Sequence, residues 1–308
     1  MGERSTEGHG MQVLGVTETA PDFDVPAGAC DCHVHVFGPP DSFPFSPDRV
    51  YTPGLALVDD LLALQRALRL DRVVIVQPSP YGTDNSCTLD ALRQLGPRAR
   101  GVAVIDSATT DAALAEMHAA GVRGVRLNLE TLGQNDPVAA ASQLRWAAAR
   151  MAPLGWHVQT YTNLSMLTAL HDTILELPTT LVVDHFGRTP AAPGLEQPGL
   201  KQLLDLLRSG KVYIKLSAPY QISQMDDYAD AKAIVEAMVA ANPDRVLWAT
   251  NWPHPMGGGA RPRRREGIEP FRAEDDGRAL NRIARWVPDP DRLRKLLVEN
   301  PARLYWSD

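Results

Sequence analysis

Two histidines, His33 and His35, stand one residue apart in the stretch CDCHVHVFGP. Side chains of a β-strand alternate between its two faces, so a strand here directs both imidazoles, together with Asp31, to one face. Cys30 and Cys32 then lie on the other face, where small buried hydrophobic side chains are a better interpretation than a metal-binding pair. Two imidazoles on one face are suited to polarising a carbonyl group, moving a proton or binding a metal ion. The alternative is a pair of surface histidines on a loop.

The elements that position these histidines follow a regular order. Eight short β-branched runs occur at residues 28–36, 72–79, 100–106, 121–128, 156–161, 180–187, 211–217 and 245–251. Alanine- and leucine-rich stretches with helical spacing lie between many of them, at 57–70, 109–121, 138–155, 164–177, 200–210 and 228–243. Mostly apolar strands alternating with helices predict an α/β protein with a parallel sheet. Eight such units favour a single (β/α)8 TIM barrel over an open sheet, which needs a glycine-rich turn after an early strand.

The barrel prediction concentrates the chemistry at the carboxyl ends of the strands. The predicted strands end in polar side chains, which are His33, His35, Gln77, Ser79, Asp106, Arg126, Asn128, Tyr161, His185, Lys215, Ser217 and Asn251. Alternation places Gln159 on the face of Tyr161 and turns Asp184 away from the face of His185. Histidines that meet from the first and sixth strands indicate an active site rather than a core built for stability.

Composition limits the possible partners. A net charge of −6 and a pI near 5.8 argue against binding to nucleic acid or to an anionic membrane surface. There is no apolar run of the ~20 residues that a membrane helix needs, and three cysteines suit a reducing compartment. We expect a cytoplasmic protein with a small-molecule substrate, and the oligomeric state stays open. Residues 1–25 are expected to be a flexible extension, which carries no secretory signal, and residues 26–308 to form the barrel domain.

One short basic run, ARPRRRE, lies at residues 260–266. Glycines and acids flank it, so we interpret it as a solvated loop. A lid that attracts an anion is the alternative.

Several motifs in barrel order carry a resemblance to a known family. They are DCHVHVFGP, FPFSPDRVYTP, VIVQPSPYGTDN, GVRGVRLN, VVDHFGR, WATNWPHP and ENPARLYW, which together reach from about residue 28 to Trp306. The chain resembles the amidohydrolase superfamily, and within it the metal-independent lactonases that act on a pyrone dicarboxylate. The resemblance implies hydrolysis of a lactone inside the barrel, in the catabolism of aromatic or sugar-derived acids.

The same resemblance implies roles for individual residues. His33, His35 and His185 would polarise the scissile carbonyl and stabilise its oxyanion. The residues implied in holding the substrate's carboxylate and ring are Tyr51, Ser79, Arg126, Tyr161 and Arg188. Lys215 is a further candidate for steadying negative charge. His254 is open between bracing a loop and serving as an acid or base, because an unperturbed imidazole titrates near neutral pH.

Three positions depart from the pattern of those lactonases. Asn251 stands where the family places an aspartate as general base, and a carboxamide does not accept a proton at neutral pH. Either a histidine acts as the base, or Asn251 is an inactivating change. Residues 131–133 and Gln221 replace two further substrate arginines. Because an unpaired buried charge is costly, we predict a lactone with at most one carboxylate rather than the pyrone dicarboxylate.

We expect no metal cofactor, because Tyr161 and Asn251 end the strands where the superfamily's zinc sites place additional ligands. One zinc ion at His33, His35 and His185 is the alternative. Three other functions stay open. They are lactone isomerisation, zinc-dependent decarboxylation of a small unsaturated or aromatic acid, and ligand binding by a barrel that has lost its base.

Overall fold

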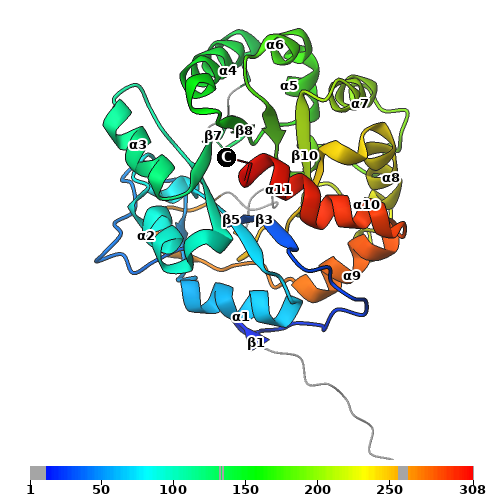
Figure 1. The fold of residues 1–308 in the computed structure, drawn as a ribbon, viewed down its shortest axis with the longest axis horizontal. Coiled ribbons are helices and arrows are strands. Elements are labelled where there is room, and N and C mark those ends of the chain that lie inside the picture. Colours follow the sequence, from blue (N-terminus) through cyan, green and yellow to red (C-terminus); the bar gives the residue numbers. More distant parts are fainter. Residues whose placement is uncertain (1–11, 132, 134, 256–262, 308) are drawn as a thin grey trace, which may run out of the picture.

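A computed structural model describes residues 12–131, 133, 135–255 and 263–307 of the chain. Eight parallel strands form one sheet in the order β3-β5-β6-β7-β8-β9-β10-β11, which confirms the predicted barrel (Figure 1). The strands are β3 (Cys30–Val34), β5 (Arg72–Val76), β6 (Ala99–Ala103), β7 (Val122–Leu127), β8 (His157–Thr160), β9 (Leu181–Val183), β10 (Val212–Leu216) and β11 (Val246–Trp248). Seven of them lie within the runs that the sequence predicted, and β6 begins one residue before its run, at Ala99.

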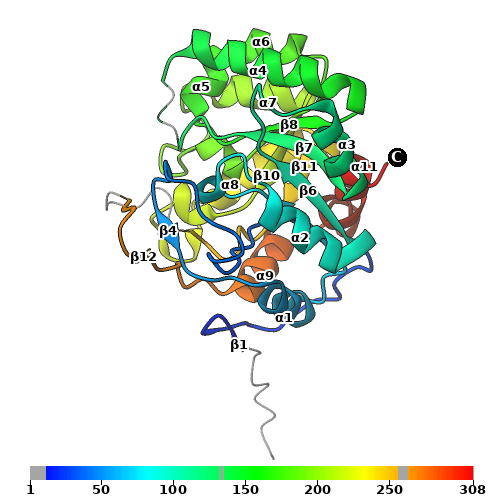
Figure 2. The same ribbon diagram turned by 90° about the vertical axis from the view of Figure 1, so that its left-hand side faces the viewer.

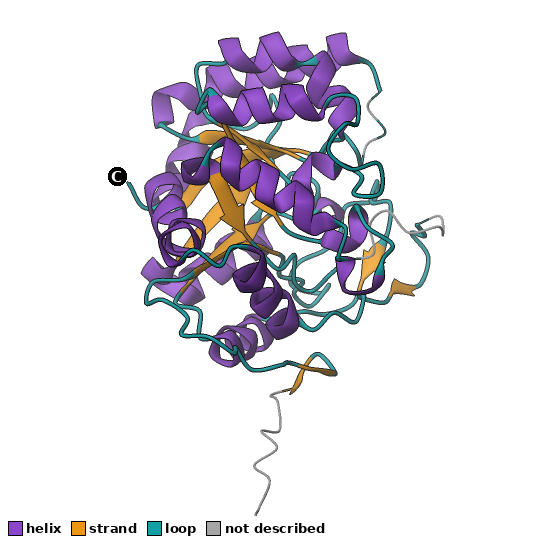
Figure 3. Ribbon diagram, turned by 90° about the vertical axis from the view of Figure 1, so that its right-hand side faces the viewer, coloured by secondary structure: helices purple, strands orange, loops and turns teal. Residues whose placement is uncertain are grey.

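Helices surround the sheet on its outer side (Figure 3). Those that follow successive strands are α1 (Val58–Leu68), α2 (Ser86–Leu95), α3 (Asp111–Ala119), α4 (Pro137–Met151), α5 (Leu164–Ala169), α6 (His171–Glu176), α7 (Leu200–Arg208), α8 (Ala231–Ala241) and α9 (Asp276–Trp286). The chain ends with α10 (Pro290–Arg294), a π-helical turn at Lys295–Glu299, and α11 (Asn300–Tyr305). The predicted helix at 164–177 is two short helices that meet at Leu170.

The barrel is closed between its first and last strands just beyond the sheet pairing. The Asn251 backbone amide donates to the His33 carbonyl at 3.0 Å, and the His35 amide donates to the Trp252 carbonyl at 2.8 Å. The buried Asp31 carboxyl adds a hydrogen bond of 2.6 Å with the Thr250 hydroxyl. The first and eighth strands are therefore joined at the end that carries the predicted catalytic residues.

The two cysteines of β3 are buried, as predicted, but they do not face away from the histidines. Cys30 and Cys32 pack inside the barrel with Tyr305 of α11, whereas Val34 packs outward against the helices. The register of β3 against β5 shifts between Asp31 and Val34. A shift of this kind interrupts strict alternation, so Cys32 and His33 both point inward.

The N-terminal segment is packed against the barrel over part of its length. Residues 1–11 lie outside the described residues, but β1 (Gln12–Val13) and β2 (Val16–Thr17) form a hairpin. The buried Glu18 accepts a hydrogen bond from the Gly277 amide, and Asn281 bonds to Ala20 and Asp22. These contacts place residues 18–22 against α9.

Two loops lie together over the carboxyl end of the barrel. β4 (Thr52–Pro53) pairs in parallel with β12 (Ile268–Glu269), and Figure 2 shows the two short strands side by side. The Thr52 hydroxyl also donates to the Arg265 carbonyl at 2.6 Å. The loop after the first strand is thus joined to the loop after the last strand. Among the described residues, no helix combines the length and the hydropathy required to cross a lipid bilayer.

Candidate active site

Three imidazole rings meet inside the carboxyl end of the barrel. The ring centres of His33 and His35 are 4.9 Å apart, and those of His33 and His185 are 4.7 Å apart. His33 and His35 leave the end of β3, and His185 follows β9, so strands far apart in the sequence bring them together. All three side chains are buried. The predicted meeting of these histidines is present in the structure.

Asp184 is the central acid of this cluster. Its Oδ1 lies 3.1 Å from His33 Nδ1 and 3.7 Å from Lys215 Nζ, and its Oδ2 accepts a hydrogen bond of 2.9 Å from Arg126 Nε. Burial acts to raise the pKa of Asp184, but the contact with His33 and the positive charges of Arg126 and Lys215 outweigh it and hold the pKa well below its usual value. The carboxylate therefore stays ionised and holds side chains from three other strands.

The prediction that Asp184 turns away from the face of His185 is wrong. β9 ends at Val183, so Asp184 continues the inward alternation of Val182, which packs inside the barrel. His185 and Phe186 then adopt left-handed backbone angles, with φ of 50° and 58°, and the chain turns back on itself. Because a left-handed turn breaks the period of two, both Asp184 and His185 enter the cluster.

Burial determines the protonation of the cluster. It lowers the pKa of His35 and His185 to about 3 and that of His33 well below its ordinary value, so the three rings are neutral at physiological pH. Burial also lowers the pKa of Lys215 to about 8, with Asp184 opposing the shift. Lys215 is therefore mostly an ammonium at pH 7.

Hydrogen bonds constrain where the imidazole protons lie. His35 Nδ1 donates to the Val76 carbonyl at 2.8 Å, so the Nε2 of a neutral His35 is an acceptor. His33 Nε2 lies 3.3 Å from that atom, and Lys215 Nζ lies 3.4 Å from His33 Nδ1. A neutral His33 can donate from Nε2 to His35 and accept at Nδ1 from Lys215, but Nδ1 then has no proton to donate to Asp184 Oδ1, which lies 3.1 Å away. With its proton on Nδ1, His33 instead donates to Asp184. The lone pairs of His33 Nε2 and His35 Nε2 then point toward each other.

The second arrangement fits a metal ion. Two imidazole nitrogens bound to tetrahedral zinc at about 2.0–2.1 Å lie roughly 3.3 Å apart, as the Nε2 atoms of His33 and His35 do. The ligand atoms of His33, Asp184 and His185 also lie within 4.8 Å of one another, so Asp184 joins the predicted ligand set. Lys215 acts against a metal, because its ammonium lies against Asp184 and His33.

A pocket opens above the cluster. Its lining includes seven of the predicted residues, namely His35, Tyr51, Ser79, Arg126, Tyr161, His185 and Asn251. Gln221, Thr131 and Arg263 complete its polar wall, and the Tyr161 hydroxyl donates to the Gln221 side-chain oxygen at 3.0 Å. Tyr51 is buried and forms a hydrogen bond with Ser79. Two phenol rings, two guanidinium groups, two imidazoles and two side-chain amides thus face one small cavity.

Arg263 is a pocket residue that the sequence analysis missed. It belongs to the basic run at 260–266, of which residues 260–262 lie outside the described residues, while Arg264 and Arg265 are exposed. The Arg263 guanidinium carbon lies 3.4 Å from the centre of the Tyr51 ring, and its Nη2 lies 2.5 Å from Glu269 Oε1. The available sequence signal was the basic run itself, but no local pattern distinguishes Arg263, which lines the pocket, from the exposed Arg264 and Arg265.

Four predicted residues lie outside the pocket lining. His33 and Lys215 lie beneath it in the buried cluster, where Lys215 also donates to Gln159 at 2.7 Å. Arg188 pairs with Glu130 at 2.5 Å. His254 lies behind Asn251 and contacts Asp276 at 3.1 Å.

Comparisons with known proteins agree with this fold. The family model described as amidohydrolase matches residues 30–306. The chain is 39% identical to a 2-pyrone-4,6-dicarboxylate hydrolase of Comamonas testosteroni, covering 94% of this chain and 93% of the relative. It is 35% identical to a 4-sulfomuconolactone hydrolase of Rhizobium radiobacter, covering 92% and 91%. An apo crystal structure from Agrobacterium tumefaciens superposes with a TM-score of 0.80 at 27% identity, covering 94% and 99%. The chain belongs to the amidohydrolase family.

Proposed function

We propose that the protein is a hydrolase that opens a small lactone by attack of water on the ring carbonyl. The observation that carries the proposal is the single pocket that joins His35, His185, Arg126 and Asn251 at the carboxyl end of the barrel. Two hydrolases of cyclic esters among its relatives support the same reaction class.

The pocket supplies the groups that this reaction needs. The neutral imidazoles beside the ring carbonyl, with Lys215 behind them, stabilise the negative charge that forms on the carbonyl oxygen when water adds. One of the two imidazoles that line the pocket, His35 or His185, accepts the proton that the water loses and returns it to the ring oxygen that leaves. Asn251 orients the water by accepting a hydrogen bond from it. The product is an open-chain hydroxy acid or its keto form.

The charges around the pocket favour a substrate with one carboxylate. Arg188 is paired with Glu130, and Arg263 is paired with Glu269. Asp184 neutralises only one of the two cations that it contacts, Arg126 and Lys215. Among the described residues named here, one positive charge therefore remains for the ligand. A second carboxylate on the substrate would have to compete with Glu269 for Arg263, and unpaired buried charge is costly.

The first experiment identifies the product by mass. Purified protein is incubated with a panel of lactones that carry no, one or two carboxylates, and the products are measured by mass spectrometry. Hydrolysis adds the mass of one water, isomerisation leaves the mass unchanged, and decarboxylation removes carbon dioxide. Turnover of a lactone with the mass of one water added supports the proposal, and isomer formation alone would contradict it.

Substrate charge is tested with Glu269→Gln, which removes the partner of Arg263. The ratio of kcat/KM for dicarboxylate over monocarboxylate lactones is expected to rise about 5-fold, because a half-buried ion pair contributes about 1 kcal/mol. Glu266→Gln is the matched control, since Glu266 is an exposed acid of the same loop. Wild-type protein that prefers the dicarboxylate would contradict the assignment of substrate charge.

We also propose that the reaction does not depend on a metal cofactor. The support is that Lys215 and Arg126 bring positive charge to Asp184, where a divalent cation would otherwise provide it. Elemental analysis of protein purified without chelator, followed by dialysis against a chelator, tests this. Activity that survives removal of all metal supports it, whereas stoichiometric zinc whose removal abolishes activity contradicts it.

The cellular setting is part of the same proposal. The three buried thiols, all within the described residues and none in a disulfide, suit a reducing cytoplasm. A net charge of −6 argues against binding to nucleic acid. The reaction suits the catabolism of aromatic or sugar-derived acids, in which lactones are opened to acids.

A further inference from the structure

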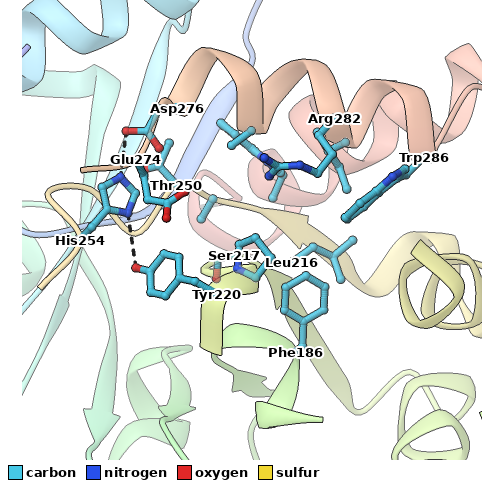
Figure 4. Close-up of a pocket in the computed structure, with 15 residues that line it drawn as sticks. Phe186, Leu216, Ser217, Tyr220, Thr250, His254, Glu274, Asp276, Arg282 and Trp286 are labelled. Atoms are coloured by element: carbon cyan, nitrogen blue, oxygen red, sulfur yellow. Dashed lines mark hydrogen bonds and ion pairs between the residues drawn. The ribbon is translucent and has the colours of Figure 1, made fainter. Parts of the chain in front are cut away.

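A chain of hydrogen bonds runs from Asn251 to Asp276, the first residue of helix α9. Asn251 Nδ2 donates to the Tyr220 hydroxyl at 2.8 Å, the Tyr220 hydroxyl lies 3.3 Å from His254 Nδ1, and His254 Nε2 lies 3.1 Å from Asp276 Oδ2. Figure 4 shows the last three side chains in line beside a small cavity behind the active site. Tyr220 is half-buried, and the other three side chains are buried.

The backbone holds this chain in an uncommon geometry. Asn251 and His254 both have left-handed φ angles, of 73° and 63°, and Ala218, just before the Tyr220 turn, has φ of 50°. Each such residue costs roughly 1–2 kcal/mol unless the surrounding structure stabilises it. Asparagine tolerates this conformation better than most residues. The hydrogen bonds among Asn251, Tyr220, His254 and Asp276 offset part of that cost.

The donors and acceptors give the chain a direction. The Nδ2 group of Asn251 only donates, so the Tyr220 oxygen accepts from it. The Tyr220 hydrogen then points to His254 Nδ1, and the remaining ring proton of His254, on Nε2, points to Asp276. With Nδ2 held in this way, the other end of the amide, Oδ1, is directed toward the pocket that Asn251 lines.

We propose that Tyr220, His254 and Asp276 are positioning residues that hold the Asn251 amide with Oδ1 toward the attacking water. The role of the water rests on the proposed lactone hydrolysis, whereas the direction of the hydrogen-bond chain is a property of the protein alone. An aspartate at position 251 would reverse the chain, because a carboxylate accepts from Tyr220 and His254 Nδ1 must then donate.

The direction of the chain depends on the charge of His254. The charged and titratable groups that surround it come from several elements and are Asp31, Tyr220, Arg272, Glu274, Asp276 and Glu18. Burial acts against the imidazolium, but Asp276 and Glu274 outweigh it and raise the pKa of His254 above its ordinary value. A protonated His254 donates from Nδ1, so two donors converge on the Tyr220 oxygen and the phenolic hydrogen loses its acceptor. Activity should therefore fall as the pH falls through the pKa of His254.

The test that does not require activity is a titration of His254 followed by the ¹⁵N shifts of its ring. Wild-type protein is compared with Asn251→Asp, Tyr220→Phe and the double variant Asn251→Asp/Tyr220→Phe. We expect the neutral wild-type ring to carry its proton on Nε2. Asn251→Asp should raise the pKa of His254 by about one unit when Tyr220 is present, and clearly less when Tyr220 is phenylalanine.

Equal shifts in the two backgrounds would mean that Tyr220 does not couple the two residues, and the proposal would be wrong. A neutral wild-type ring with its proton on Nδ1 would overturn it as well. Either result leaves the proposed hydrolysis intact, so the two failures are distinguishable.

The kinetic arm uses the lactone that the mass assay identifies. Tyr220→Phe should lower kcat about 10-fold with little change in KM, and should flatten the acidic side of the pH profile. Tyr305→Phe is the matched control, because Tyr305 is buried at the opposite end of the barrel. A Tyr220→Phe variant with the kcat and pH profile of the wild type would contradict the positioning role.

Discussion

Two buried histidines at opposite ends of the barrel differ in what they face. Burial lowers the pKa of both His185 and His157 to about 3. His157 begins β8 at the amino end, lies edge-on to Tyr305 with ring centres 5.2 Å apart, and fills the space above Gly124. His185 lies at the carboxyl end, accepts or donates a hydrogen bond of 2.7 Å with Ser217, and lines the pocket. A lowered pKa thus reports burial. His157 also borders a cavity at the amino end, so it is the polar groups that share the pocket of His185, such as Arg126 and Asn251, that distinguish a reactive imidazole from a packed one.

The largest expected contrast is in the free energy of unfolding, between Asp184 at the carboxyl end of the barrel and Asp244 at the amino end. Asp184→Asn removes the buried charge that holds Arg126 and Lys215, so we expect a loss of roughly 3–5 kcal/mol in the free energy of unfolding. Asp244→Asn, at the amino end, breaks exposed pairs with Lys295 and Arg303 and should cost at most about 1 kcal/mol. Urea unfolding followed by circular dichroism measures both. Equal losses would mean that Asp184 is no more important to the fold than a surface acid.

The two histidines themselves should separate activity from stability. His185→Asn should lower kcat by about 10²–10³-fold while the protein stays folded, because a group that stabilises the oxyanion is lost. His157→Asn should lower the melting temperature and leave kcat of the folded protein within about twofold, as for other packing changes far from a site. Steady-state kinetics and thermal melts on both variants test the contrast. It fails if His157→Asn reduces kcat as strongly as His185→Asn does.

A smaller and fully reversible effect is expected from Lys215. Its pKa of about 8 lies below the ordinary 10.5, so the ammonium is lost as the pH rises through about 8. We expect kcat/KM to fall on that side of the pH profile. Between about pH 8 and 10.5 the unfolded chain binds the proton that the folded protein has lost, so this group makes the free energy of unfolding rise with pH. A flat alkaline limb up to pH 10 would show that the ammonium has no part in the reaction.

Local patterns in the sequence were sufficient to predict the barrel fold. The eight β-branched runs and the helical spacing between them predicted the barrel, because burial on both faces of a parallel sheet leaves a periodic signal along the chain. The positions of His33, His35 and His185 at strand ends followed from the same pattern. The burial of Cys30 and Cys32 was predicted correctly, but the face to which they were assigned was wrong.

The misplaced residues share one physical cause. The register shift in β3 and the left-handed turn at His185 each break the alternation on which the assignment of faces depends, which is why Cys32 and Asp184 were assigned to the wrong faces. Both irregularities lie at the carboxyl ends of strands, where the chain leaves the sheet. Alternation is therefore least reliable where the chemistry is concentrated.

The amino-acid sequence by itself determined the order of the strands and helices, the family and the three imidazoles, since each of these depends on neighbouring residues. Only the tertiary structure decided that Asp184 joins Arg126 and Lys215, that Arg263 turns into the pocket, and that Asp276 lies behind His254. These contacts link residues that are at least 22 positions apart in the chain. Packing and loop pairing in the folded barrel, rather than any local pattern, bring such residues together.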